Sequence, residues 1–133
     1  MSGKQAKILA DRHVADLLFF AGTTRHVTRN RVIVLLSVKA GLRAAEIAQL
    51  TWDMVVDPTG EIAPSIELHN RAAKKGSGRL IPMHPALVDA LQTLRRPAVV
   101  TGPIIRSERG GPMPAVSIVN WFAKAYRTLG LAG

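Results

Sequence analysis

Apolar residues recur at intervals of three and four over most of this chain, which is the spacing of helices that bury one face. The segment 4–20 shows this spacing, and Gly22 follows it as a helix-ending residue. A second helix is predicted to start near Thr28 and to run to about Lys39. It is apolar nearly all round over residues 32–38, as expected of a central helix that is buried on every side.

Gly41 interrupts the second helix, and a shorter helix is predicted to open at Arg43 or Ala44. Two amphipathic helices follow later in the chain, one beginning at Pro85 and the other spanning about residues 115–129. One side of the last helix carries a set of apolar residues that includes Val116, Val119 and Phe122.

Between these helices the apolar pattern changes to the alternation of strands. Residues 65–69 alternate as a strand, and a basic, glycine-rich turn then leads to residues 79–83, which return as the second strand of a hairpin. Val55 and Ile62 are candidates for a first short strand. The order of elements predicts an α+β fold that is mainly helical, with a small three-stranded antiparallel sheet.

Composition narrows the class of protein. The chain has 133 residues, of which 47% are hydrophobic and none is cysteine, so it is one domain or part of one and has no disulfide or thiolate metal site. Its four histidines do not have metal-ligand spacing, and its apolar runs are too short to span a bilayer. No secretory signal is evident. We therefore expect a cytoplasmic protein with no membrane partner, no metal and no cofactor.

The net charge of the chain indicates what kind of partner it binds. The chain has 18 Lys and Arg against 9 Asp and Glu, and this net charge of +9 favours an anionic partner such as nucleic acid. Arg43 stands at the junction of two predicted helices, where a packed turn would hold its guanidinium as a rigid receptor for phosphate oxygens. A fixed guanidinium can also stabilise the charge that develops when a phosphodiester is attacked, and a lysine can protonate the leaving oxygen.

Two stretches carry a resemblance to a known family. GLRAAEIAQLTWDMV, which contains Arg43, resembles the first arginine motif of the tyrosine recombinase (phage integrase) family, and AAKKGSGRLIPMHPAL is similar to that family's lysine hairpin. The resemblance covers residues 28–133 as the N-terminal part of a catalytic domain, with residues 1–27 as a lead-in helix. It implies a site-specific recombinase that binds double-stranded DNA, self-associates on it, and breaks and rejoins it through a 3′-phosphotyrosine intermediate.

The resemblance also implies roles for individual residues. Arg43 matches the first catalytic arginine, which binds the scissile phosphate. Lys74 matches the hairpin lysine that protonates the leaving 5′ oxygen, with Lys75 as the competing assignment because a gap of one residue would exchange them. Glu46 matches an acidic residue of structural support.

Other parts of the family pattern have no counterpart in these 133 residues. The segment WFAKAYRTLGLAG resembles the helix that precedes the family's His-x-x-Arg box, but the box, the later His or Trp and the nucleophilic tyrosine are missing. Tyr126 comes before the box would begin and lies on an apolar helical face, which favours a packing role. We therefore expect residues 1–133 to be inactive on their own.

Several basic residues are candidates for DNA contact outside the motifs. Arg29 and Arg31 form a possible phosphate-binding patch with Arg25 and His26, although a solvated helix start explains them equally well. Arg106 and Arg109 are undecided in the same way. The hairpin adds three further candidates, His69, Lys75 and Arg79.

Two other classes of function compete with a recombinase. A non-catalytic basic DNA-binding module accounts for the charge as well, and it makes no special demand on Arg43. A helical interaction protein with an acidic partner is the third possibility. His84, before Pro85, is expected to be a surface residue near a helix start.

Overall fold

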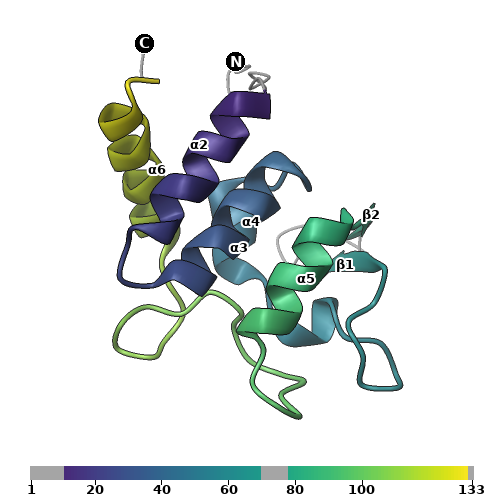
Figure 1. Ribbon diagram of the computed structural model, residues 1–133. Coiled ribbons are helices and arrows are strands. Elements are labelled where there is room, and N and C mark those ends of the chain that lie inside the picture. Colours follow the sequence, from purple (N-terminus) through teal and green to yellow (C-terminus); the bar gives the residue numbers. More distant parts are fainter. Residues whose placement is uncertain (1–10, 70–77, 132–133) are drawn as a thin grey trace.

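The computed structural model describes residues 11–69 and 78–131. Its helices are α2 (Asp11–Gly22), α3 (Val27–Val38), α4 (Ala44–Gln49), α5 (Pro85–Leu94) and α6 (Ala115–Leu129), with a 3-10 turn η1 at Trp52–Met54. The strands are β1 (Ser65–His69) and β2 (Gly78–Pro82). Figure 1 shows α2 and α6 on one side of the molecule, α5 and the two strands on the other, and α3 with α4 between them.

Helix α3 is the centre of the fold, as its apolar sequence predicts. Its segment Val32–Leu36 is buried on every side, and the helix packs against α2, α4 and α5. The helix begins at Val27, and its N-cap is His26, two residues before the predicted N-cap Thr28. Gly22 is the last residue of α2, and residues 4–10 of that predicted helix lie outside the described residues.

The turn after α3 fixes the position of Arg43. Gly41 has φ +72°, a left-handed conformation that glycine adopts without a steric penalty. The turn is closed by the Leu42 amide, which donates to the Leu36 carbonyl over 3.1 Å, and the Leu42 side chain is buried. Arg43 follows directly as the N-cap of α4, with extended backbone angles of φ −80° and ψ 160°.

The described sheet has two antiparallel strands, and the predicted third strand is not confirmed. Val56 and Ile62 pair with each other in an isolated bridge instead. In the β1–β2 register, Leu68 stands opposite Arg79 and Ile66 stands opposite Ile81. Directly opposite residues share a face of the sheet, so Arg79 lies on the same face as the buried Ile66 and Leu68 and is directed toward the helices.

Helix α6 closes the other side of the molecule. It buries Ile118 and Ala125, while Val116 and Val119 are exposed at 64% and 53%. Trp121 is half-buried and makes edge contacts with Phe20 of α2 and with Phe122, at ring-centroid distances of 5.7 and 5.2 Å. These aromatic contacts join α6 to α2. The predicted apolar side of α6 is only partly covered, because Val116 and Val119 are exposed.

Candidate nucleic-acid interface

Arg43 is held by its backbone and exposed at its side chain. Its amide donates to Oε1 of Glu46 over 3.0 Å, which is the hydrogen bond that a glutamate at the third position of a helix makes to the N-cap residue. The Leu42 side chain before it is anchored in the core. The guanidinium therefore extends into solvent from a fixed root, as a receptor for a phosphate requires.

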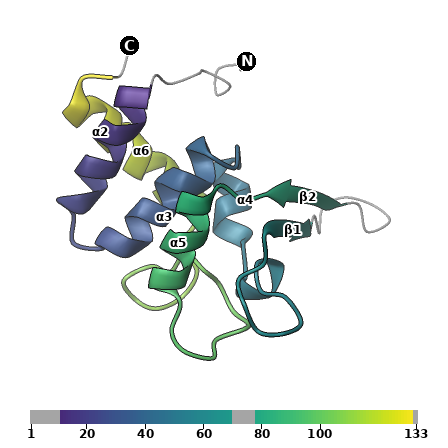
Figure 2. The ribbon, with the colours of Figure 1, turned by 45° about the vertical axis from the view of Figure 1, so that its right-hand side comes forward.

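Glu46 connects this turn to the hairpin. Its second oxygen, Oε2, accepts from Nη2 of Arg79 over 2.8 Å, and the Glu46 side chain is 27% exposed. One carboxylate thus binds both the backbone of Arg43 and the side chain of Arg79. Arg79 lies 33 residues after Glu46 in the sequence. Figure 2 shows β2 extending beside α4, in agreement with this contact.

The other hairpin candidates stand as follows. Lys74 and Lys75 lie outside the described residues. His69 is exposed at the end of β1, opposite Gly78, where the hairpin enters the segment that is not described. The described part of the hairpin that lies near Arg43 is the start of β2, which is linked to Arg43 through Arg79 and Glu46.

Arg29 and Arg31 lie at the opposite end of α3 and face different surroundings. Arg29 donates from Nε to Oδ1 of Asn30 over 2.9 Å and from Nη1 to the Arg106 carbonyl over 3.0 Å. Burial lowers the pKa of Arg29 from its usual value, and the charge of Glu108 opposes part of this shift. Arg31 is exposed and borders a groove of about 420 Å³ formed mainly by apolar residues of α2.

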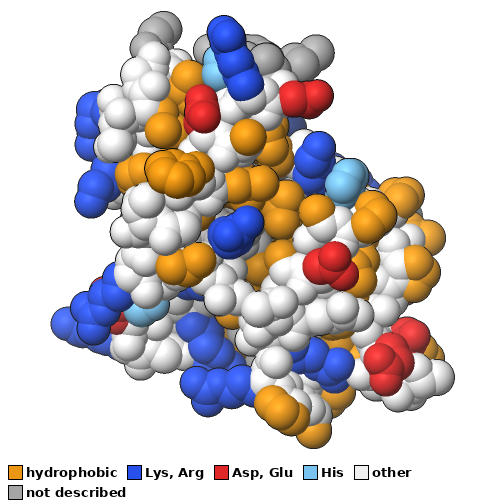
Figure 3. Space-filling view, in the orientation of Figure 1, with side chains coloured by type: hydrophobic (Ala, Val, Ile, Leu, Met, Phe, Trp, Pro, Cys, Tyr) orange, Lys and Arg blue, Asp and Glu red, His pale blue; other side chains and the backbone are white. Residues whose placement is uncertain are grey.

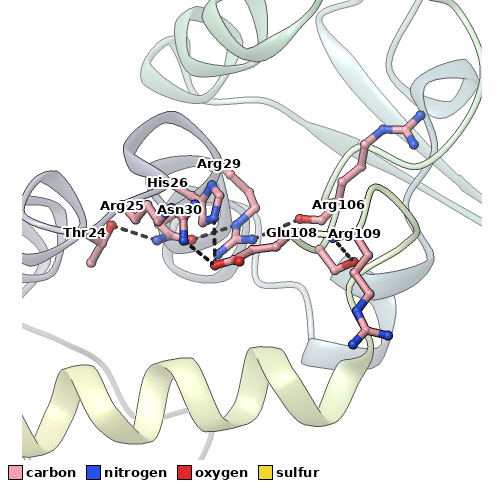
Figure 4. Close-up of polar contacts among 9 residues, drawn as sticks. Thr24, Arg25, His26, Arg29, Asn30, Arg106, Glu108 and Arg109 are labelled. Atoms are coloured by element: carbon pink, nitrogen blue, oxygen red, sulfur yellow. Dashed lines mark hydrogen bonds and ion pairs between the residues drawn. The ribbon is translucent and has the colours of Figure 1, made fainter.

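A second polar cluster lies near Arg29, and no pattern in the sequence indicates that its members meet. Oε2 of Glu108 lies 3.3 Å from Nε2 of His26 and 3.5 Å from Nη1 of Arg25. Below it the buried Asn30 donates to Oγ1 of Thr24 over 2.8 Å. Figure 4 shows the turn before α3 and the loop around Glu108 meeting through these contacts. The partners are 82 and 83 residues apart, so no local pattern could pair them.

The Glu108 cluster predicts a dependence of stability on pH. The hydrogen bond with His26, followed by the charge of Arg25, lowers the pKa of Glu108 below its usual value of 4.5. A lowered folded-state pKa adds stability above the unfolded-state value, and this contribution is lost as the pH falls through the folded-state pKa. We expect Glu108→Gln to be less stable than the original chain at neutral pH, and the difference to disappear in acid.

Denaturant titrations at neutral pH and at successive pH values below 4.5 measure this difference. Glu67→Gln, on the exposed face of β1, is the matched control and should show no such convergence. A gap between Glu108→Gln and the original chain that stays constant into acid would contradict the linkage.

Two other kinds of site are not found in the part of the chain that the structure describes. No group of three or more histidine, aspartate or glutamate side chains there could hold a metal ion. None of the helices over residues 11–69 and 78–131 has the length and apolar character needed to cross a membrane.

Comparison with solved structures identifies the fold. No protein-family model and no curated protein sequence matches the chain. The XerA recombinase matches 96% of this chain with a TM-score of 0.73 at 19% identity. A lambda integrase tetramer bound to a Holliday junction matches 96% with a TM-score of 0.66 at 21% identity. The catalytic core of lambda integrase matches 94% with a TM-score of 0.65 at 21% identity.

The chain is shorter than each of these neighbours. It spans 44% of the XerA chain, 37% of the integrase chain in the tetramer and 71% of the catalytic core. At such low identity the likeness concerns the fold, which agrees with the resemblance seen in the arginine and lysine motifs. The chain therefore has the fold of the tyrosine recombinases and integrases, and it spans less than half of the length of the XerA recombinase.

Proposed function

We propose that this chain is the N-terminal part of the catalytic domain of a tyrosine-type DNA recombinase, with residues 28–133 as the domain segment and residues 1–27 as the lead-in to it. The observation that carries the proposal is the link through Glu46. Its carboxylate joins the turn that presents Arg43 to the strand that leads from the lysine hairpin, with contacts of 3.0 and 2.8 Å. Because the chain has the fold of tyrosine recombinases, we interpret this link as the support of a catalytic arginine and a catalytic lysine.

In the proposed reaction, Arg43 binds the scissile phosphate and stabilises the charge that develops on its non-bridging oxygens. Lys74, or Lys75 in the alternative register, donates a proton to the leaving 5′ oxygen. A tyrosine attacks the phosphorus and forms a 3′-phosphotyrosine bond, which conserves the bond energy for rejoining. The 133 residues contain no counterpart of this tyrosine, so the nucleophile has to come from outside them.

Glu46 and Arg79 have supporting roles in this proposal. Arg79 uses one side of its guanidinium on Glu46, and its side chain is still 56% exposed. A guanidinium has five donor groups, so the pair with Glu46 leaves others to contact DNA. Arg31, His69 and Lys75 are further proposed contacts to the DNA backbone.

The partner is double-stranded DNA, and the complete enzyme self-associates on it. The net charge of +9 supports the first part. The lambda integrase neighbour is a tetramer on a Holliday junction, which supports the second. The proposal requires no metal, because the nucleophile is a side chain and the phosphate is bound by cationic residues.

We expect residues 1–133 to bind duplex DNA weakly at low salt and not to cut it. Binding should fall steeply as salt rises, because phosphate contacts release counterions. Fluorescence anisotropy with a labelled duplex measures binding, and incubation with supercoiled plasmid, followed by denaturing electrophoresis, detects nicking and covalent attachment. A covalent adduct formed by this chain would refute the predicted inactivity.

The same assays separate the competing functions. A non-catalytic DNA-binding module predicts that Arg43→Ala costs about one phosphate contact, like any other exposed arginine. A protein that binds an acidic partner predicts no affinity for DNA even at low salt. That second result would overturn the recombinase proposal.

A further inference from the structure

A basic patch lies at the N-terminal end of α3, away from Arg43. It consists of two segments far apart in sequence that meet at one surface, and its members are Arg25, His26, Arg29, Arg106 and Arg109. Within it, Arg25, His26 and Arg29 face the single acidic residue, Glu108, and Arg106 and Arg109 lie on either side of Glu108 in the same loop. Four arginines against one glutamate give the two segments a local excess of three positive charges. In Figure 3 the blue side chains gather around a histidine at the lower left, over these two segments.

The patch is built on a rigid support. The Ser107 amide donates to the Gly111 carbonyl over 2.8 Å, and Nη1 of Arg106 donates to the Gly110 carbonyl over 2.6 Å, so the loop is a closed turn. Arg29 joins this turn to α3 through the Arg106 carbonyl. Figure 4 shows the contact between Arg29 and Arg106, with the Arg109 side chain extending away from the turn. Because these contacts hold the backbone that carries the cations, binding of an anion needs to order only their side chains.

Glu108 occupies the position of an anion within this patch. Its carboxylate contacts His26 and Arg25 at 3.3 and 3.5 Å, while its side chain remains 60% exposed. Arg25 is 79% exposed and has four further donor groups to offer. A phosphate at the surface could therefore accept hydrogen bonds from the N–H groups of Arg25 that Glu108 does not use.

We propose that this patch is a second binding site for the phosphate backbone of duplex DNA, and that Glu108 weakens it by competing for Arg25 and His26. The inference rests on the proposed function, since it takes DNA as the partner. Helix α3 has 12 residues and is therefore about 18 Å long. That length separates the patch from the end of α3 that leads to Arg43, and it corresponds to about five base pairs of duplex.

The experiment measures how the DNA affinity of residues 1–133 depends on salt, by anisotropy with a labelled duplex. The double variant Arg25→Ala and Arg109→Ala should lower the slope of log affinity against log salt by about two, since each lost phosphate contact removes about 0.9. Both arginines are exposed, so the variant should fold, and circular dichroism checks that it does.

The matched control is Arg12→Ala with Arg127→Ala, which removes the same charge from the far ends of α2 and α6. It should change the slope by much less. Glu108→Gln should tighten DNA binding about fivefold at low salt, because it removes a negative charge near the bound phosphates.

The outcomes separate this inference from the proposed function. If the original chain binds DNA and Arg43→Ala weakens it, but the patch variant matches the Arg12/Arg127 control, only the second site is overturned. Weaker binding by Glu108→Gln would also overturn it, because the carboxylate would then support the DNA contact. If the original chain binds no DNA at low salt, both proposals fail together.

Discussion

Replacing Arg43 by lysine is expected to lower the rate of DNA strand cleavage by about 100- to 1,000-fold in a complete recombinase that contains this segment. Lysine keeps the positive charge but has a single ammonium group in place of a planar fork with two parallel donors. The charge on the phosphate oxygens would then be stabilised less in the transition state than in the bound substrate. Affinity for duplex DNA should change little, because one charge contact remains.

Single-turnover cleavage of a suicide duplex, which traps the covalent intermediate, measures the rate, and anisotropy measures affinity. Arg96→Lys, an exposed arginine just after α5, is the matched conservative control and should leave both unchanged. Equal losses of cleavage and affinity in Arg43→Lys would mean that Arg43 only holds DNA, which is the behaviour of a non-catalytic module.

Ile118→Ala is expected to lower the free energy of unfolding by about 2–5 kcal/mol, which is a large part of the stability of a small domain. Ile118 is fully buried in α6, and this helix packs against α2 and α4. Removing its side chain would leave a cavity between α6 and the core. Because α4 carries Arg43 at its N-cap, loosening α6 would also loosen the support of the candidate site.

Val119→Ala is the matched control on the same helix. Val119 is 53% exposed, so its truncation should change the unfolding free energy by less than about 0.5 kcal/mol. Denaturant unfolding followed by circular dichroism gives both values. Similar losses for the two variants would show that α6 is packed differently from the structure.

The sequence predicted the elements with strong local patterns. The apolar run of α3 indicated a buried central helix, and the alternation of residues 65–69 with the glycine-rich turn after them indicated the two paired strands. His84 was expected near a helix start, and it is the N-cap of α5, where its Nδ1 accepts from the Ala86 amide over 3.0 Å. In each case the signal comes from residues close together in the chain.

What the sequence did not predict depends on contacts between distant residues. The basic hairpin indicates Arg79 only as a DNA contact, and the pairing of Arg79 with Glu46 depends on how the sheet is placed against α4. The Glu108 cluster likewise needs two loops to meet. Val116 and Val119 follow the helical spacing of buried residues, yet they are exposed because no described element covers that side of α6.

The geometry at Glu46 makes two parts of the chain depend on one side chain. Its two oxygens have different partners, one in the main chain at residue 43 and one in a side chain of β2. Aspartate is shorter by one methylene group and would reach only one of them without a shift of the backbone. We therefore expect a substitution at residue 46 to be tolerated best when residue 79 changes with it.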